Sequence, residues 1–339
     1  MQEALFYEKY PDGSVRCSLC RHRCSIVPGG RGICHVRENH GGMLVSLVYG
    51  NVVAEQVDPV EKKPLFHVLP GTTTYSIATA GCNFTCRHCQ NHAIAQYDPG
   101  SDSTVPGHNI PPEEIVRRAL ASGCRSISYT YTEPTIFFEY MLEVARLASR
   151  VGLKNFMVTN GYITPEALDA LAPYLDAANI DLKGFDDRFY HRIAGASLEQ
   201  VLGCIRDFHR RGIWIEITSL IIPDENDSQK QLEDMAAFIV SELGADVPWH
   251  ISRFFPRHRM VDRGATPEDS LQRAVDAGSR AGLHFIYVGN CEGGIENTCC
   301  PGCGAVLIRR RGYRIMANDL DRGCCRRCGI PIGGLWEGP

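Results

Sequence analysis

Seven short runs of β-branched and aromatic residues alternate with helical stretches between residues 74 and 290, and this alternation constrains the fold most. The helical stretches include residues 111–123 and residues 164–175, where Thr164 is the expected N-cap and Pro165 the first helical residue. The alternation predicts an α/β fold with a parallel sheet covered on both faces, either an open doubly wound sheet or a full or partial barrel. The seven runs are YSIAT (75–79), SISYTYT (126–132), NFMVT (155–159), AANIDL (177–182), IWIEITSLII (213–222), WHISRF (249–254) and HFIYV (284–288).

Four segments follow from this organisation. Residues 1–45 form an N-terminal cysteine-rich segment with too little apolar material for a core of its own, and residues 46–73 are a connecting segment. Residues 74–292 carry the strand and helix alternation. Residues 293–339 lose it and hold two CxxC pairs with a basic stretch at 308–314, which predicts a small third unit.

Composition excludes several classes of protein. Of the 339 residues 44% are hydrophobic and 22% charged, which excludes a disordered or collagen-like chain. The 35 basic and 39 acidic residues give a net charge of -4, so no global field would hold nucleic acid or an anionic membrane. The first 15 residues lack the apolar core of a signal peptide, and no run of about 18 apolar residues occurs. A cytoplasmic location is therefore expected.

Sixteen cysteines are an unusually high count, and most of them are clustered. Cytosolic thiols stay reduced, so clustered cysteines predict metal ligands or catalytic groups rather than disulfides. Cys82, Cys86 and Cys89 follow directly on the first strand of the alternation, at the edge where α/β folds place their active sites. Three thiolates at this spacing suit a 4Fe-4S cluster with one iron open to a small molecule. A zinc knuckle completed by His88 or His92, or simply buried thiols, is the plainer alternative.

The two flanking cysteine sets each offer four thiolates. Zinc or an auxiliary 4Fe-4S cluster fits the N-terminal set equally well. The C-terminal set is typical of a zinc ribbon, although the adjacent Cys299 and Cys324 blur the choice of ligands and also admit an auxiliary iron-sulfur cluster. The N-terminal ligands are Cys17, Cys20, Cys24 and Cys34; the C-terminal ligands are Cys300, Cys303, Cys325 and Cys328.

The CxxxCxxC loop after the first strand resembles the signature of the radical S-adenosylmethionine (SAM) superfamily. Glu133-Pro134 resembles the end of that superfamily's Gly-Gly-Glu-Pro stretch, with Tyr131 and Thr132 in place of the glycines. The stretches TNG (159–161) and DLK (181–183) resemble those of glycyl-radical activating enzymes such as pyruvate formate-lyase activating enzyme. The resemblance implies a partial (β/α) TIM-like barrel with small metal-binding units at both termini. It also implies these SAM-binding residues: Glu133 at the amino group, Asp181 and Lys183 near the carboxylate and ribose, with Thr159 and Asn160 beside them.

A closer resemblance runs along nearly the whole chain. Residues 15–39, 46–71, 81–91, 128–140 and 287–290 are similar to the radical SAM member of the AmmeMemoRadiSam system. That family is named for its Memo-type and AMMECR-type partner proteins, so the resemblance implies such partners, together with an electron donor such as flavodoxin or ferredoxin. It leaves the substrate open.

The chemistry implied by this resemblance is reductive cleavage of SAM at the 4Fe-4S cluster. The resulting 5'-deoxyadenosyl radical would abstract hydrogen from a protein or small-molecule substrate, while the protein binds, orients and excludes water and oxygen. Four residues at or near strand ends are candidates to line that cavity: Tyr131, His250, Arg253 and Cys291.

Two other functions compete with this interpretation. In the first, the radical methylates or rearranges a peptide or RNA docked by the zinc ribbon and its arginines, and Arg310→Glu would abolish a salt-sensitive association. In the second, the chain is a non-catalytic zinc-binding interaction protein. Polar groups such as Glu133, Asn160 and Lys183, expected to converge on one edge of the sheet, argue against the second.

Overall fold

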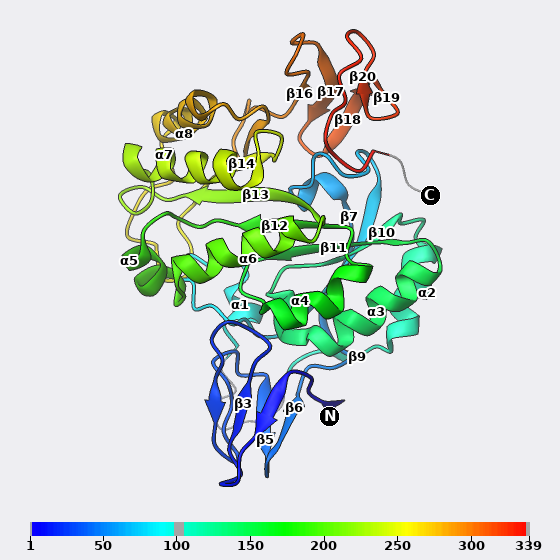
Figure 1. Cartoon of the computed structure of the whole chain (residues 1–339), viewed down its shortest axis with the longest axis vertical. Helices are drawn as coiled ribbons and strands as arrows, with labels where there is room; N and C mark the ends of the chain where they lie inside the picture. The colour runs from blue at the N-terminus through cyan, green and yellow to red at the C-terminus, as the bar shows by residue number, and fades with distance from the viewer. Residues whose placement is uncertain (1, 98–104, 337–339) are drawn as a thin grey trace.

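The computed structural model describes residues 2–97 and 105–336 and places a nine-stranded sheet at the centre of the molecule (Figure 1). Seven of its strands are parallel, and each pairs with the next along the chain. These strands are β8 (Thr73–Thr79), β10 (Ser126–Tyr129), β11 (Lys154–Thr159), β12 (Ala177–Asp181), β13 (Trp214–Ile221), β14 (Trp249–Arg253) and β15 (Ile286–Gly289). All seven predicted strands are present.

The edge beside β8 is extended by the segment predicted as a connector. Strand β7 (Asn51–Pro59) pairs antiparallel with β8, and β9 (His108–Asn109) pairs antiparallel with β7. Within the described residues, β9 and β15 end the sheet without pairing to each other. The sheet is therefore a partial barrel, as the resemblance implied, and not a closed one.

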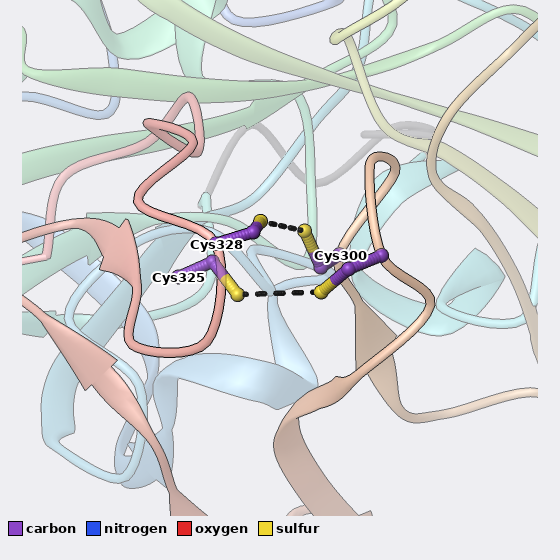
Figure 2. Close-up of side chains that lie close together, drawn as sticks. Cys300, Cys325 and Cys328 are labelled. Atoms are coloured by element: carbon purple, nitrogen blue, oxygen red, sulfur yellow. Dashed lines mark hydrogen bonds between the residues drawn. The ribbon is translucent and has the colours of Figure 1, made fainter.

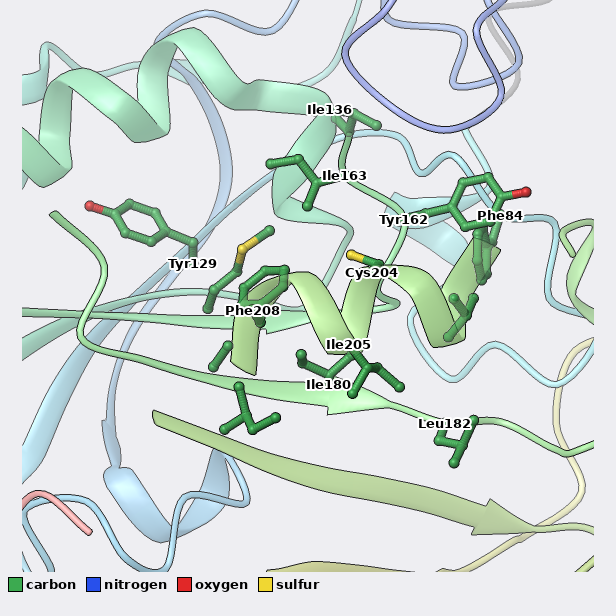
Figure 3. Packing of buried hydrophobic residues seen from close by; sticks show 14 of the residues in the cluster. Phe84, Tyr129, Ile136, Tyr162, Ile163, Ile180, Leu182, Cys204, Ile205 and Phe208 are labelled. Carbon is green, nitrogen blue, oxygen red and sulfur yellow. The ribbon is translucent and has the colours of Figure 1, made fainter. Parts of the chain in front are cut away.

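Helices cover the outer face of the sheet (Figure 1). Helix α4 begins at Pro165 as predicted, because the Thr164 hydroxyl accepts the backbone N–H of Ala167. In Figure 3, Ile205 and Phe208 of α6 pack onto Ile180 of β12. The longer helices are α2 (Pro112–Ala121), α3 (Phe138–Arg150), α4 (Pro165–Leu171), α6 (Leu198–Arg210), α7 (Gln229–Phe238) and α8 (Glu268–Ala281), and the short ones are α1 (His92–Ala95) and α5 (Asp187–Phe189).

The N-terminal unit consists of two small antiparallel sheets that contact the loops at the carboxyl ends of the parallel strands. The backbone N–H of Thr164, just beyond β11, donates to the carbonyl of Leu19, and that of Arg21 donates to the carbonyl of Tyr162. A buried ion pair between Arg37 and Glu139 joins this unit to α3. The strands are β1 (Gln2–Glu3), β5 (Arg37–His40) and β6 (Met43–Ser46) in one sheet and β2 (Tyr7–Lys9), β3 (Val15–Cys17) and β4 (Ser25–Ile26) in the other.

The C-terminal unit lies at the opposite end of the molecule (Figure 1). It packs on the segment that precedes β8. The guanidinium of Arg310 donates to the carbonyl of Phe66, and the backbone N–H of Leu335 donates to the carbonyl of His67. It therefore covers the amino ends of the parallel strands. Its strands are β16 (Thr298–Cys299), β17 (Val306–Arg311), β18 (Arg314–Asn318), β19 (Leu320–Asp321) and β20 (Cys324–Cys325).

None of the helices among the described residues is both long enough and apolar enough to span a lipid bilayer.

Candidate radical SAM site

Cys82, Cys86 and Cys89 lie on the loop that leaves the carboxyl end of β8. The loop is held from one side by the π-helical turn Tyr190–Ala194, because Thr85 N–H donates to the carbonyl of Ala194 at 2.9 Å. Gly195 follows that turn at a φ of 73°, and a Cβ there would come 2.3 Å from the Thr85 hydroxyl. Only glycine permits this close approach, so the cysteine loop has a fixed support.

Cys86 is buried, and Cys82 and Cys89 are half-buried. Burial raises the pKa of Cys82 well above its usual value, raises that of Cys86 to about 12, and also raises that of Cys89. Nearby thiols contribute to the rise, because Cys86 and Cys89 repel a negative charge on Cys82. Neutral thiols of this kind become good metal ligands when a cation replaces their protons.

Asn160 and Asn83 lie next to Cys82 and offer polar atoms to the same space. Asn160 Nδ2 donates to Asn83 Oδ1 at 2.8 Å and lies 3.9 Å from Cys82 Sγ. Within the described chain, the buried Asn160 Oδ1 and Asn83 Nδ2 have no hydrogen-bond partner. Buried polar atoms are almost always paired, so these two indicate a polar ligand beside the thiols. Three thiols on one loop, with such atoms beside them, fit a three-cysteine 4Fe-4S cluster and its SAM.

Glu133 ties together the ends of β10 and β11. Its side chain is buried and accepts hydrogen bonds from the backbone N–H of Asn160 at 2.8 Å and from the Thr159 hydroxyl at 2.8 Å. It also accepts hydrogen bonds from the backbone N–H and the hydroxyl of Thr135, so Glu133 is the N-cap of the 3-10 turn Pro134–Phe137. Burial nevertheless raises the pKa of Glu133. The carboxylate is thus engaged within the chain, and contact with the SAM amino group stays a prediction.

Asp181 and Lys183 form an ion pair at the end of β12, with Lys183 Nζ 2.7 Å from an Asp181 oxygen. Burial lowers the pKa of Lys183, but attraction to Asp181 and Cys86 outweighs it and raises the pKa above its usual value. The lysine therefore stays cationic beside the thiols. Glu133, Asp181 and Lys183 interact electrostatically with cysteines of the loop. Asn160 hydrogen-bonds to Asn83 of the same loop, and Thr159 is joined to this group through Glu133.

Tyr131 follows β10 and hydrogen-bonds through its hydroxyl to Asp58 of β7. Lys63 Nζ lies 2.6 Å from the same carboxylate and 4.5 Å from the centre of the Tyr131 ring. Lys63 is only 2% exposed, and burial lowers its pKa to about 8. Sequence reasoning missed Asp58 and Lys63, which lie in the segment 46–73 that was predicted only as a connector; the acid and lysines of DPVEKK (58–63) were the available signal.

Arg253 and Cys291 lie near each other at the ends of β14 and β15. The Asn290 side chain donates to the Arg253 carbonyl at 2.8 Å, and the Arg253 charge partly offsets the rise that burial causes in the pKa of Cys291. Within the described residues, the buried Arg253 Nε has no partner. Both residues lie at the carboxyl edge of the sheet, as expected.

His250 does not lie at that edge. It is the second residue of β14, near the amino end, where its Nε2 lies 2.6 Å from the fully buried Glu216. Its ring packs against Phe66 and Tyr287, which belong to the covered end of the barrel. The expectation that His250 lines the active cavity is therefore corrected: this side chain is a buried structural partner.

The C-terminal cysteines form a compact tetrad (Figure 2). Cys300 Sγ lies 3.5 Å from Cys328 Sγ, and Cys303 Sγ lies 3.7 Å from Cys325 Sγ. All four sulfurs are within 4.8 Å of one another, a spacing that suits one tetrahedral ion with Zn–S bonds of about 2.3 Å. Cys299 and Cys324 lie outside this tetrad, so the four cysteines of the tetrad are the ones that can bind a single metal ion.

Arg310 would present its charge to a partner only in the alternative in which the zinc ribbon docks a peptide or RNA, and the structure does not support that placement. Its side chain is buried and donates to the Phe66 carbonyl at 2.6 Å and to the Thr298 hydroxyl at 2.8 Å. Arg309, Arg311 and Arg314 are exposed. Strand alternation explains the difference, since neighbouring residues of β17 face opposite sides.

Comparison with known proteins shows the superfamily to which the chain belongs. Residues 76–239 match the family model described as the radical SAM superfamily. The chain is 44% identical over 335 residues to the uncharacterised protein MJ0808 of Methanocaldococcus jannaschii, covering 98% of this chain and 99% of that protein. It is 24% identical over 210 residues to MJ1632 of the same organism, which is provisionally named a glycyl-radical enzyme activating enzyme, covering 59% of this chain and 75% of that protein.

A solved structure of Streptococcus suis SuiB has the same fold, with a TM-score of 0.50 at 15% identity over 69% of this chain and 52% of that chain. Three cysteines on the loop after β8, at the carboxyl edge of a partial barrel, agree with these matches. The chain belongs to the radical SAM superfamily.

Proposed function

We propose that this protein is a radical SAM enzyme in which Cys82, Cys86 and Cys89 hold a 4Fe-4S cluster that cleaves SAM reductively. The 5'-deoxyadenosyl radical that SAM then supplies would abstract hydrogen from a protein or small-molecule substrate. The observation that carries this proposal is the three-thiol loop with the unpaired, buried amide atoms of Asn83 and Asn160 beside it.

The chain's own residues have separable tasks in this site. The three cysteines supply thiolates, and Lys183 offsets their negative charge from within an ion pair. Glu133 fixes the loop end that carries Asn160. Tyr131, Arg253 and Cys291 border the same edge of the sheet and are the candidates to contact substrate. The segment before β8 and the C-terminal unit cover the opposite end, which excludes water from that side.

The relative MJ1632 supports a glycyl-radical activating role as one form of this chemistry. Docking of a peptide or RNA by the zinc ribbon finds less support, because the ribbon covers the amino ends of the strands while the cysteine loop lies at their carboxyl ends. The partnership with Memo-type and AMMECR-type proteins rests on the sequence resemblance.

The test is formation of 5'-deoxyadenosine. The full chain would be reconstituted anaerobically with iron and sulfide, then mixed with dithionite and SAM. We expect product from the native protein and none from Cys86→Ala. Cys124→Ala is the matched control, because Cys124 is equally buried but lies at the amino end of β10. Absence of product from native protein whose iron and sulfide content shows an intact cluster would refute the proposal.

A further inference from the structure

The N-terminal cysteines surround a common space. Cys17, Cys20, Cys24 and Cys34 line one small, largely enclosed cavity. The rest of its wall is mainly apolar, with side chains from the N-terminal unit and from the barrel. The remaining lining residues are Leu19, His22, Ile26, Gly32, Ile33, Arg37, Asn83 and Ile136.

The spacing of these sulfurs differs from that of the C-terminal tetrad. Among the described residues, the C-terminal four are the only group of three or more such ligands whose atoms all lie within 4.8 Å of one another. One zinc ion with bonds of about 2.3 Å to four thiolates needs sulfurs about 3.8 Å apart. The N-terminal thiols do not meet this requirement. Thiolates bound to four different irons of one cluster must stand farther apart, because the cluster lies between them.

The guanidinium of Arg37 supplies a positive charge at the wall of the cavity. Arg37 is 2% exposed, pairs with Glu139 at 2.9 Å, and interacts electrostatically with Cys17 and Cys34. Its Nε is buried and has no hydrogen-bond partner in the described part of the chain. A metal cluster with four thiolate ligands carries net negative charge, and a buried guanidinium with a free donor suits it.

The cavity also shares a wall with the cysteine loop of the SAM site. Asn83 of that loop and Ile136, which follows Glu133, both line it. His22 Nε2 lies 2.8 Å from the carbonyl oxygen of Asn83, and the His22 ring packs on Tyr162. The N-terminal cysteines therefore lie directly behind the loop that carries Cys82. The C-terminal cysteine tetrad lies at the other end of the barrel.

We propose that Cys17, Cys20, Cys24 and Cys34 hold a second 4Fe-4S cluster, fully ligated by protein thiolates and packed behind the SAM-site loop. Four protein ligands leave no iron open, so this cluster does not bind SAM. Its ligands fasten β3, the following turn and Cys34 into one unit that supports Asn83. The inference concerns metal content and stands whether or not SAM is cleaved.

The test uses the full chain with Cys82→Ala, Cys86→Ala and Cys89→Ala together, reconstituted anaerobically with iron and sulfide in the presence of zinc. We expect about four irons and four labile sulfides per chain, with about one zinc at the C-terminal tetrad. The reduced protein should give an electron paramagnetic resonance signal that added SAM does not alter. Addition of Cys20→Ser and Cys24→Ser to this variant should abolish iron and sulfide and leave the zinc.

A second variant guards against loss of folding in the first. In otherwise native protein, Cys20→Ser with Cys24→Ser should halve the iron content from about eight to about four per chain. The remaining signal should respond to SAM. Two zinc ions and no labile sulfide in the triple-alanine variant would overturn the inference, as would unchanged iron in the double-serine variant. Failure of the proposed function would show differently, as an intact SAM-site cluster without 5'-deoxyadenosine.

Discussion

The carboxylate of Glu133 accepts the backbone N–H of Asn160 at 2.8 Å, which ties the loop after β11 to the end of β10. The side chain of Asn160 in turn donates to Asn83 in the cysteine loop. The ends of three neighbouring strands, β8, β10 and β11, are thus joined through two hydrogen bonds. The geometry of the SAM site depends on this chain of contacts rather than on the cysteine loop alone.

Replacement of Glu133 by Gln should break the first contact. A glutamine offers one oxygen and one NH2 group where the carboxylate serves four donors, so at least one donor loses its acceptor. A buried unsatisfied donor costs about 1–3 kcal/mol. We expect the denaturation midpoint to fall by an amount that corresponds to this cost, and less 5'-deoxyadenosine, because the loop end that carries Asn160 loses its support. Glu233→Gln on the exposed face of α7 is the control. Equal activity of both variants would contradict the role given to Glu133.

The contact between Asn83 and Asn160 should protect the cluster. We expect Asn83→Ala and Asn160→Ala each to speed the loss of the cluster's visible absorbance on exposure to chelator. Because both variants remove the same hydrogen bond, the double variant should lose the cluster little faster than the worse single variant. Fully additive effects on the logarithm of the rate would show that the two side chains act independently.

The barrel and the cysteine loop could be predicted from the sequence, because both depend on residues that are close together in the chain. Each parallel strand is a short apolar run, and the three thiols lie within eight residues. The pairing of β7 with β8 could not be predicted in this way, because antiparallel pairing of a segment depends on contacts outside its own sequence. The same holds for Asp58, which lies in β7, and for Lys63, which lies just beyond it; both contact Tyr131.

The surroundings of two residues, His250 and Arg310, could have been predicted correctly from their positions within their strands. His250 is second in the predicted strand 249–254, so it belongs near the amino end of a parallel strand and away from the active edge. Arg310 lies in VLIRRR, where period-two alternation turns it to the same face as the buried Ile308. The spacing between thiols of distant segments is a tertiary property, and only the structure separates the compact C-terminal tetrad from the N-terminal set.

The C-terminal tetrad should bind one zinc ion through four defined cysteines. Cys303→Ser should lower the zinc content of the purified protein by about one ion per chain and destabilise the C-terminal unit, since structural zinc sites contribute directly to folding. Cys299→Ser and Cys324→Ser are the matched controls, because these thiols are adjacent to the ligands but outside the tetrad. Zinc loss in either control would mean that the ligand set is assigned wrongly.

His67 should make stability depend on pH. Its Nε2 lies 2.7 Å from the Tyr287 hydroxyl and its Nδ1 2.7 Å from the Gly333 carbonyl, and burial lowers its pKa to about 4. Between pH 4 and the usual value of about 6.5, the unfolded chain binds a proton there and the folded chain does not. Stability from this group is therefore complete above pH 6.5 and declines as the pH falls through that window.

The measurement is the urea midpoint followed by tryptophan fluorescence, since Trp214 and Trp336 both lie beside the His67 ring. We expect the midpoint to fall from pH 7.5 to pH 5.0 in native protein. His67→Gln removes the titrating group, so its midpoint should be lower at pH 7.5 and change less with pH. His284→Gln, at a partly exposed position on the same side of the barrel, controls for general histidine effects. A native pH slope that persists in His67→Gln would assign the dependence to other groups.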